Sequence, residues 1–135
     1  MADLLEQSVR VAAAQGFPPH YRLHKSHEFD AVFKGNKYRL SGPEFLVLAV
    51  ENQVKHCRLG MVIGKKNAGA AVQRNRIKRL IRESFRTQGP QANESPCLDI
   101  VIVARSGVST RDNQHLADVL AKGWKKLFKK ASVST

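Results

Sequence analysis

The segment AAVQRNRIKRLIRESFRTQ, residues 70–88, decides the fold because only a helix gathers its apolar side chains on one side. These side chains lie at positions i, i+3, i+4 and i+8, which share one side of a helix: Ile77, Leu80, Ile81 and Phe85. At about 100° per residue, an arc opposite them holds polar and basic side chains. They are Lys78, Arg82, Asn75, Arg86 and Arg79, with Arg74 and Arg76 at the borders. The sequence therefore predicts a helix with one core face and one cationic face, which Gly89-Pro90 ends.

The other elements are expected on both sides of this helix. Ser26 is predicted to cap a short helix that ends at Gly35 and carries Phe29, Val32 and Phe33 on its apolar stripe. Apolar runs bounded by turn residues predict strands at 38–40, 45–50, 58–64 and 98–104, and a final amphipathic helix is expected at 112–130. This order predicts an α+β fold, a single domain in which three helices pack against about four strands.

The strand at 58–64 carries an unusual face. Gly60, Val62 and Gly64 point to the same side and leave it with little side-chain bulk. We expect a helix, rather than a ligand, to pack closely against the backbone there. We also expect this strand to pair with the strand at 45–50.

Composition limits the classes of function. The chain has 135 residues, and its 23 Lys and Arg exceed its 11 Asp and Glu, which gives a formal net charge of +12. Such a charge indicates a polyanionic partner, although charge alone does not separate RNA, DNA and an anionic membrane surface. The longest apolar run, 45–50, is far shorter than the roughly 20 residues that span a bilayer. We expect a soluble, cytoplasmic protein that does not act at a membrane, with Cys57 and Cys97 as reduced thiols.

No catalytic or metal-binding pattern stands out. Serines and histidines occur without a nucleophile elbow, and the HxxHE cluster that begins at His24 offers too few metal ligands. The segment 60–66 has three residues between its glycines, where a phosphate-binding loop needs four, and Lys66 where that loop needs Ser or Thr. We therefore expect no catalytic residue, no metal site and no intrinsic cofactor in this chain.

The basic helix and the two phenylalanines each allow a structural and a functional interpretation. A charged face is usually only solvated, but such faces normally mix acids with bases. From Lys65 to Arg86 the only acid is Glu83, which favours contact with nucleic acid. Phe29 and Phe33 are core residues by default, yet aromatic rings beside a basic surface can also stack on unpaired bases.

The segment Arg74-Asn-Arg-Ile-Lys-Arg-Leu-Ile-Arg-Glu-Ser-Phe-Arg86 resembles the protein subunit of bacterial ribonuclease P. The resemblance extends over about residues 17–130. It includes the pairs Phe17-Pro18, Arg22-Leu23 and Ala71-Val72, the pattern Phe29-x-x-Val32-Phe33, the segments 58–67 and 99–105, and the helix around Trp124. Residues 17–131 are thus expected to form the RNA-binding domain, with 1–16 as a flexible extension and 132–135 as a tail.

The resemblance implies a left-handed βαβ crossover, although such connections are right-handed in about 98% of cases. It also implies that the catalyst is a large RNA with bound Mg²⁺, which removes the 5′ leader from precursor transfer RNA. The chain would then be the accessory subunit, one per catalytic RNA, with that RNA and precursor transfer RNA as its partners.

The residues implied for binding the catalytic RNA are Lys65, Lys66, Asn67, Arg74, Asn75, Arg76, Lys78 and Arg79. We add Arg82, which shares their cationic arc. The residues implied for the leader lie in a cleft between the first helix and the sheet: Phe29 and Phe33, with Leu48 and Met61 as weaker candidates. Leu48 stands where some relatives have an aromatic residue. The alternatives are a ribosomal or ribosome-assembly protein and a helix-turn-helix DNA-binding protein, the latter disfavoured because no partner helix directly precedes the basic one.

Overall fold

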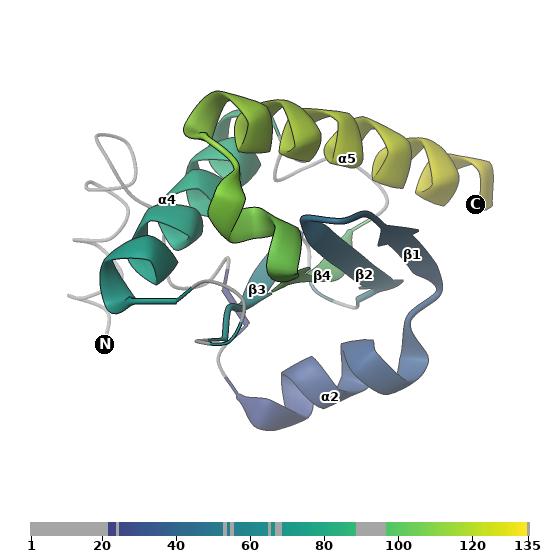
Figure 1. The fold of residues 1–135 in the computed structure, drawn as a ribbon. Helices are drawn as coiled ribbons and strands as arrows, with labels where there is room; N and C mark the ends of the chain where they lie inside the picture. Colours follow the sequence, from purple (N-terminus) through teal and green to yellow (C-terminus); the bar gives the residue numbers. More distant parts are fainter. Residues whose placement is uncertain are drawn as a thin grey trace, which may run out of the picture.

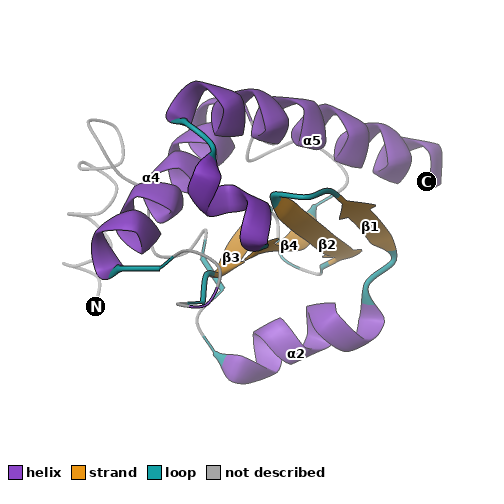
Figure 2. Ribbon diagram, in the orientation of Figure 1, coloured by secondary structure: helices purple, strands orange, loops and turns teal. Residues whose placement is uncertain are grey.

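The computed structural model describes residues 22, 23, 25–52, 54, 56–64, 66, 69–88 and 97–134. The extension expected at 1–16 lies outside them. The elements, in chain order, are α2 (Ser26–Gly35), β1 (Tyr38–Ser41), β2 (Phe45–Glu51), β3 (Arg58–Val62), α4 (Ala71–Gln88), β4 (Leu98–Ala104), the 3₁₀ turn η2 (Ser106–Thr110) and α5 (Asn113–Ser134). The α+β class is confirmed (Figure 2). The last helix is longer than predicted and includes residues 132–134, which were expected to form a tail.

The four strands form one mixed sheet in the order β1-β2-β4-β3. The predicted pairing of the strand at 58–64 with the strand at 45–50 is wrong, because β4 lies between them. β4 runs antiparallel to β2 and parallel to β3. Its side chains are buried on both faces, as expected for a central strand. The chain from β3 through α4 to β4 is a βαβ crossover, and its hand stays the prediction drawn from the family resemblance.

One face of the sheet is covered by α4 and α5 (Figure 1). Ile77 and Ile81 of α4 and Leu116 of α5 are fully buried there with Ile100 of β4. The two helices are joined through Trp124, whose indole N–H donates to Oγ of Ser84 at 2.7 Å. This contact satisfies two buried polar groups and fixes how the outer face of α4 is presented.

The opposite face of the sheet is covered by α2, and no other described helix lies on that side (Figure 1). Val32 is fully buried against Leu48 and Val101. The ring of Phe29 lies directly on Gly60: a Cβ at Gly60 would stand 2.6 Å from Cε1 of Phe29. The expectation that a helix packs closely on this bare part of β3 is confirmed.

The first turn of α2 is held by acidic and basic side chains. The helix is capped at Lys25 and not at Ser26, so that prediction is wrong. The reason is Glu28, whose Oε1 accepts a hydrogen bond from the backbone N–H of Lys25 at 2.9 Å. Glu28 also contacts Arg58 of β3, with an Nη1 to Oε2 distance of 3.1 Å. Arg58 in turn donates two hydrogen bonds of 2.8 Å to Asp99 of β4. These charges tie the start of α2 to the edge of the sheet.

Within the part of the chain that the structure describes, no helix combines the length and apolar character that crossing a membrane requires.

Gly60→Ala should lower the free energy of unfolding by about 1 to 3 kcal/mol, because the new methyl group overlaps the Phe29 ring and forces α2 outward. Gly64→Ala is the matched control, since a Cβ there meets nothing within 4 Å. Urea unfolding of both variants measures the difference. Equal midpoints would mean that the ring of Phe29 does not rest on Gly60.

Candidate nucleic-acid interface

The outer face of α4 is cationic, as the sequence predicts. Its core side is occupied by Ile77, Ile81 and Phe85, which are buried. Asn75 and Arg79 on the opposite side are exposed, and Lys78 is half-buried. These three side chains make no hydrogen bond or ion pair with any residue that the structure describes. Their donors are therefore available to a ligand.

Three other arginines of α4 already have partners inside the protein. Arg76 donates from Nε to Oε1 of Gln73 at 2.9 Å and from Nη1 to Oδ1 of Asn113 at the start of α5. Arg74 donates to the backbone oxygen of Gly69 at 2.9 Å, and Arg86 forms an ion pair with Glu83. Arg76 thus joins α4 to α5, a role that its place on the helix arc did not indicate.

Arg82 differs from all of these because its Nε is buried and has no hydrogen-bond partner among the described residues. Burial lowers the pKa of Arg82, and the charges of Arg22 and Arg79 lower it further. A buried donor without a partner is costly, and the neighbouring positive charges add to the cost, so the surroundings of Arg82 favour an anion. Arg22, which precedes α2, was not assigned to this surface from the sequence. No local pattern reveals it, because Arg22 is distant from α4 in the sequence and is held beside β3 by a bridge to Leu59.

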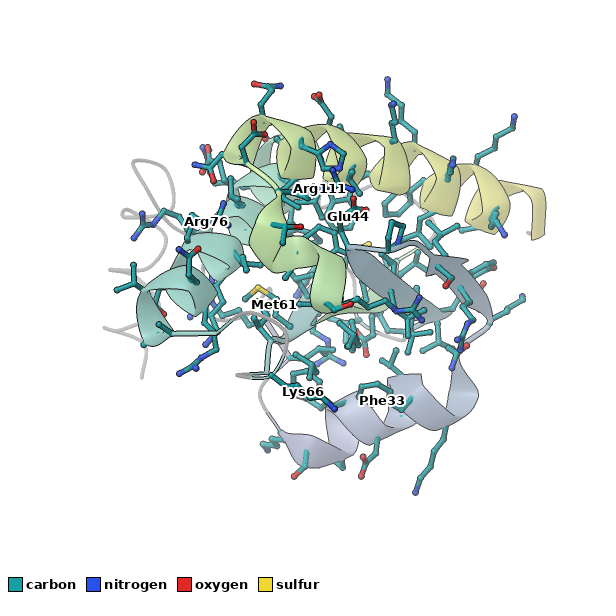
Figure 3. The ribbon with its side chains drawn as sticks, viewed as in Figure 1. Phe33, Glu44, Met61, Lys66, Arg76 and Arg111 are labelled. Carbon is teal, nitrogen blue, oxygen red and sulfur yellow. The ribbon has the colours of Figure 1, made fainter. Side chains whose placement is uncertain are left out.

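Three residues before α4 were also predicted to bind the catalytic RNA. Lys66 is exposed, whereas Lys65 and Asn67 lie outside the described residues. Val72 in the first turn of α4 is 76% exposed, which is unusual for a large apolar side chain. Figure 3 shows Lys66 and Arg76, with Arg111 close to Arg76. The carbonyl oxygen of Arg111 is 3.5 Å from Nη2 of Arg76.

The second candidate surface is formed by α2 and the sheet. Phe33 is 42% exposed, and in Figure 3 it lies on the side of α2 nearer the sheet. Phe29, one turn earlier, is half-buried because it rests on Gly60. The two phenylalanines were assigned the same role from the sequence, but only Phe33 presents a large part of its side chain to solvent.

A row of side chains across the sheet remains partly open beside α2. Ser41 pairs with Leu46, Leu46 with Val103 and Val103 with Val62, so the four side chains lie on one face in one row. Leu46 and Val103 are half-buried, and Val62 is 38% exposed. These residues were not predicted as site residues. Strand alternation places them on the α2 face, but the row itself depends on the insertion of β4.

The two weaker candidates on the sheet are not part of this open surface. Leu48 lies on the correct face but is only 3% exposed beneath α2, so a base cannot reach it in this conformation. The placement of Met61 beside Phe33 is wrong. Met61 precedes Val62 on β3 and therefore points to the opposite face, where it packs against the cluster under α4 and α5.

The molecule thus presents a cationic surface and an apolar surface on opposite sides of one sheet (Figure 1). Among the described residues, no three His, Cys, Asp or Glu side chains lie close enough together to hold a metal ion. The cationic surface fits a folded polyanion, and the apolar surface fits unpaired bases.

Comparison with known proteins shows the family to which the chain belongs. The family model described as Ribonuclease P matches residues 17–128. The ribonuclease P protein component of Stutzerimonas stutzeri is 46% identical over 114 residues, which is 84% of this chain and 85% of that protein.

Two solved structures are also similar. The RNase P protein from Thermotoga maritima is 31% identical, has a TM-score of 0.65, and the match covers 78% of this chain and 96% of that one. A Staphylococcus aureus RNase P protein mutant with defective mRNA degradation activity is 28% identical, has a TM-score of 0.72, and the match covers 93% of this chain and 97% of that one. These matches favour ribonuclease P over the ribosomal alternative. The chain therefore belongs to the ribonuclease P protein family, as a protein component of that enzyme.

Proposed function

We propose that this subunit holds two RNAs on its two sides, while the catalytic RNA and its bound Mg²⁺ cleave the substrate. The cationic face of α4 binds the catalytic RNA, and the surface beside α2 binds the single-stranded 5′ leader of precursor transfer RNA. The complex contains one protein per catalytic RNA and acts in the cytoplasm. The observation that carries this proposal is the buried Nε of Arg82, which has no partner within the described residues and lies beside two further arginines.

The two surfaces suit different ligands. The α4 face offers guanidinium groups, whose planar forks match phosphate oxygens, and it lacks exposed aromatic rings. The α2 surface offers Phe33 and an apolar row, which favour stacking and apolar contact with bases of any sequence. A leader held in this way is bound with little sequence preference, as a processing enzyme with many substrates requires.

RNA-free protein should show no nuclease activity, and the protein should stimulate cleavage by its catalytic RNA most at low Mg²⁺. The reason is that its cations replace metal ions that otherwise screen two polyanions from each other. The measurement is cleavage of precursor transfer RNA by the catalytic RNA with and without the chain, over a series of Mg²⁺ concentrations. Specific cleavage by protein that has been treated to destroy copurifying RNA would contradict the proposal.

Lys78→Ala and Arg79→Ala should each weaken binding of the catalytic RNA and flatten the slope of log K against log salt by about 0.7 to 0.9, which is the effect of one lost phosphate contact. Arg86→Ala is the matched control and should change the slope less, because Arg86 is paired with Glu83. Thermal midpoints should be close to wild type in all three variants. Equal slopes in Lys78→Ala, Arg79→Ala and the wild type would leave the α4 face as an ordinary solvated surface.

Arg76→Ala is expected to behave differently from these variants. It removes the hydrogen bonds that join α4 to Asn113 and Arg111 of the α5 region, so its thermal midpoint should fall as well as its affinity for RNA. Loss of affinity for RNA with an unchanged thermal midpoint would mean that these hydrogen bonds contribute nothing to stability.

Phe33→Ala should weaken binding of precursor transfer RNA to the holoenzyme by about 1 to 3 kcal/mol, the value of one stacked base, and should not affect mature transfer RNA, which lacks a leader. Its stability should change little because the ring is 42% exposed.

Phe29→Ala is the contrasting variant. It should cost about 3 kcal/mol of stability, because it removes the ring that packs on Gly60 and Leu23. Affinities for the two transfer RNAs and the thermal midpoint are measured for each variant. Equal losses for precursor and mature transfer RNA in Phe33→Ala would exclude leader stacking at Phe33.

A further inference from the structure

A pocket of about 340 Å³ lies between α5 and the hairpin of β1 and β2. Its walls are mostly apolar and include Leu40, Phe45, Val47, Val119 and Trp124. The volume lies within the range of small-ligand sites, about 300 to 1,000 Å³. Of the lining residues, only Ser41 also belongs to the row beside α2, and none belongs to the α4 face, so neither surface described above accounts for this pocket.

Gly123 opens the pocket on the side of α5. It stands in the interior of the helix, where glycine is less favourable than alanine. A Cβ at Gly123 would meet nothing within 4 Å, so crowding in the folded protein does not explain the glycine. The missing side chain instead leaves empty space in the wall of the pocket.

Two lysines flank this glycine and also line the pocket. Lys122 and Lys126 are one helical turn apart, both are exposed, and neither forms an ion pair with any described residue. The helix dipole does not account for them, because it favours cations in the last turn and these lysines lie near the middle of α5. An apolar pocket with two free cations at its rim fits a ligand that has an apolar body and negative charges beside it.

The wall formed by the turn between β1 and β2 is fixed in place. Glu44 in this turn is buried and lies 2.8 Å from Nε2 of His115 on α5. Gly107 lies so close beneath the turn that a Cβ there would stand 2.7 Å from the backbone oxygen of Pro43. A pocket with anchored walls binds without the cost of ordering a loop.

We propose that this pocket holds one unpaired base of the RNA partner, with Lys122 and Lys126 on the phosphates next to that base. A nucleobase has two apolar faces and is attached to a charged backbone, so it uses the apolar walls and the cationic rim together. An uncharged apolar ligand would leave the lysines without a role. The inference rests on the proposed function in that the partner is RNA, but the site lies apart from the α4 face and shares only Ser41 with the row beside α2.

The single tryptophan of the chain provides a local measurement, because Trp124 lines the pocket. Titration of the full-length protein with short oligouridylates should change the Trp124 fluorescence to a saturating value. Gly123→Leu fills the open space and should weaken this binding about fivefold or more. The double variant Lys122→Gln/Lys126→Gln should weaken it too and flatten the salt slope by about 1.4, or roughly 0.7 per phosphate of a single strand.

Lys125→Gln/Lys129→Gln is the matched control. It removes the same charge from the same helix at the same spacing, but neither residue lines the pocket. Its affinity and salt slope should stay closer to wild type than those of Lys122→Gln/Lys126→Gln. Thermal unfolding checks that Gly123→Leu is folded, and if it is not, the two lysine pairs alone decide the outcome.

The proposal is wrong if both lysine pairs have equal effects, if Gly123→Leu is folded and binds like wild type, or if oligouridylate leaves the fluorescence unchanged. It is also wrong if only an apolar probe such as indole or a fatty-acid anion changes the signal. Failure of the pocket inference can be distinguished from failure of the proposed function by measuring how tightly each variant binds the catalytic RNA. If Arg79→Ala weakens that binding while the pocket variants do not alter the Trp124 response, the proposed function stands and the pocket inference fails.

Discussion

The contact between the Phe29 ring and the backbone of Gly60 determines how α2 lies on the sheet. Any side chain at position 60 would push α2 away from the sheet. The buried Val32 and Leu48 would then be exposed, instead of the row of side chains beside α2. The ion pairs of Arg58 with Glu28 and Asp99 hold the beginning of the same helix. Ion pairs fix the start of α2, and close packing fixes the turn that follows. Phe33 therefore has a defined position beside the partly open row of side chains on the sheet.

On the other side of the sheet, apolar packing and polar contacts between two helices hold α4 in place. The apolar core under α4 and α5 is continuous, and the polar contacts between the helices lie at Trp124 with Ser84 and at Arg76 with Asn113. With α4 fixed at these points, its unpaired cations lie on a rigid scaffold. Arg82 is partly buried beside the charges of Arg22 and Arg79, and the apolar packing under α4 offsets the cost of this arrangement.

Local patterns were sufficient to predict the helices, the strands and the cationic face of α4, because each depends on the spacing of residues close in sequence. Strand pairing was not predictable in the same way. β2 and β3 follow one another in the sequence, yet β4 lies between them, and this long-range event decides which side chains share a row. For the same reason the sequence did not reveal the row at Leu46, Val103 and Val62. Met61 was misplaced because it was taken from the family resemblance, although alternation along β3 puts it on the face opposite Gly60.

The position of β4 also has a consequence for how the protein is made. β4 supplies the hydrogen-bond partner of both β2 and β3, and it lies after α4 in the chain. Until the ribosome has released residues 98–104, both strands have an edge without its final partner, and α4 has an incomplete surface on which to dock. Completion of the sheet in the nascent chain therefore waits for β4, which is made after α4. Throughout that interval, the basic helix segment has been made but its docking surface is incomplete, so its cations and its apolar side chains are exposed together.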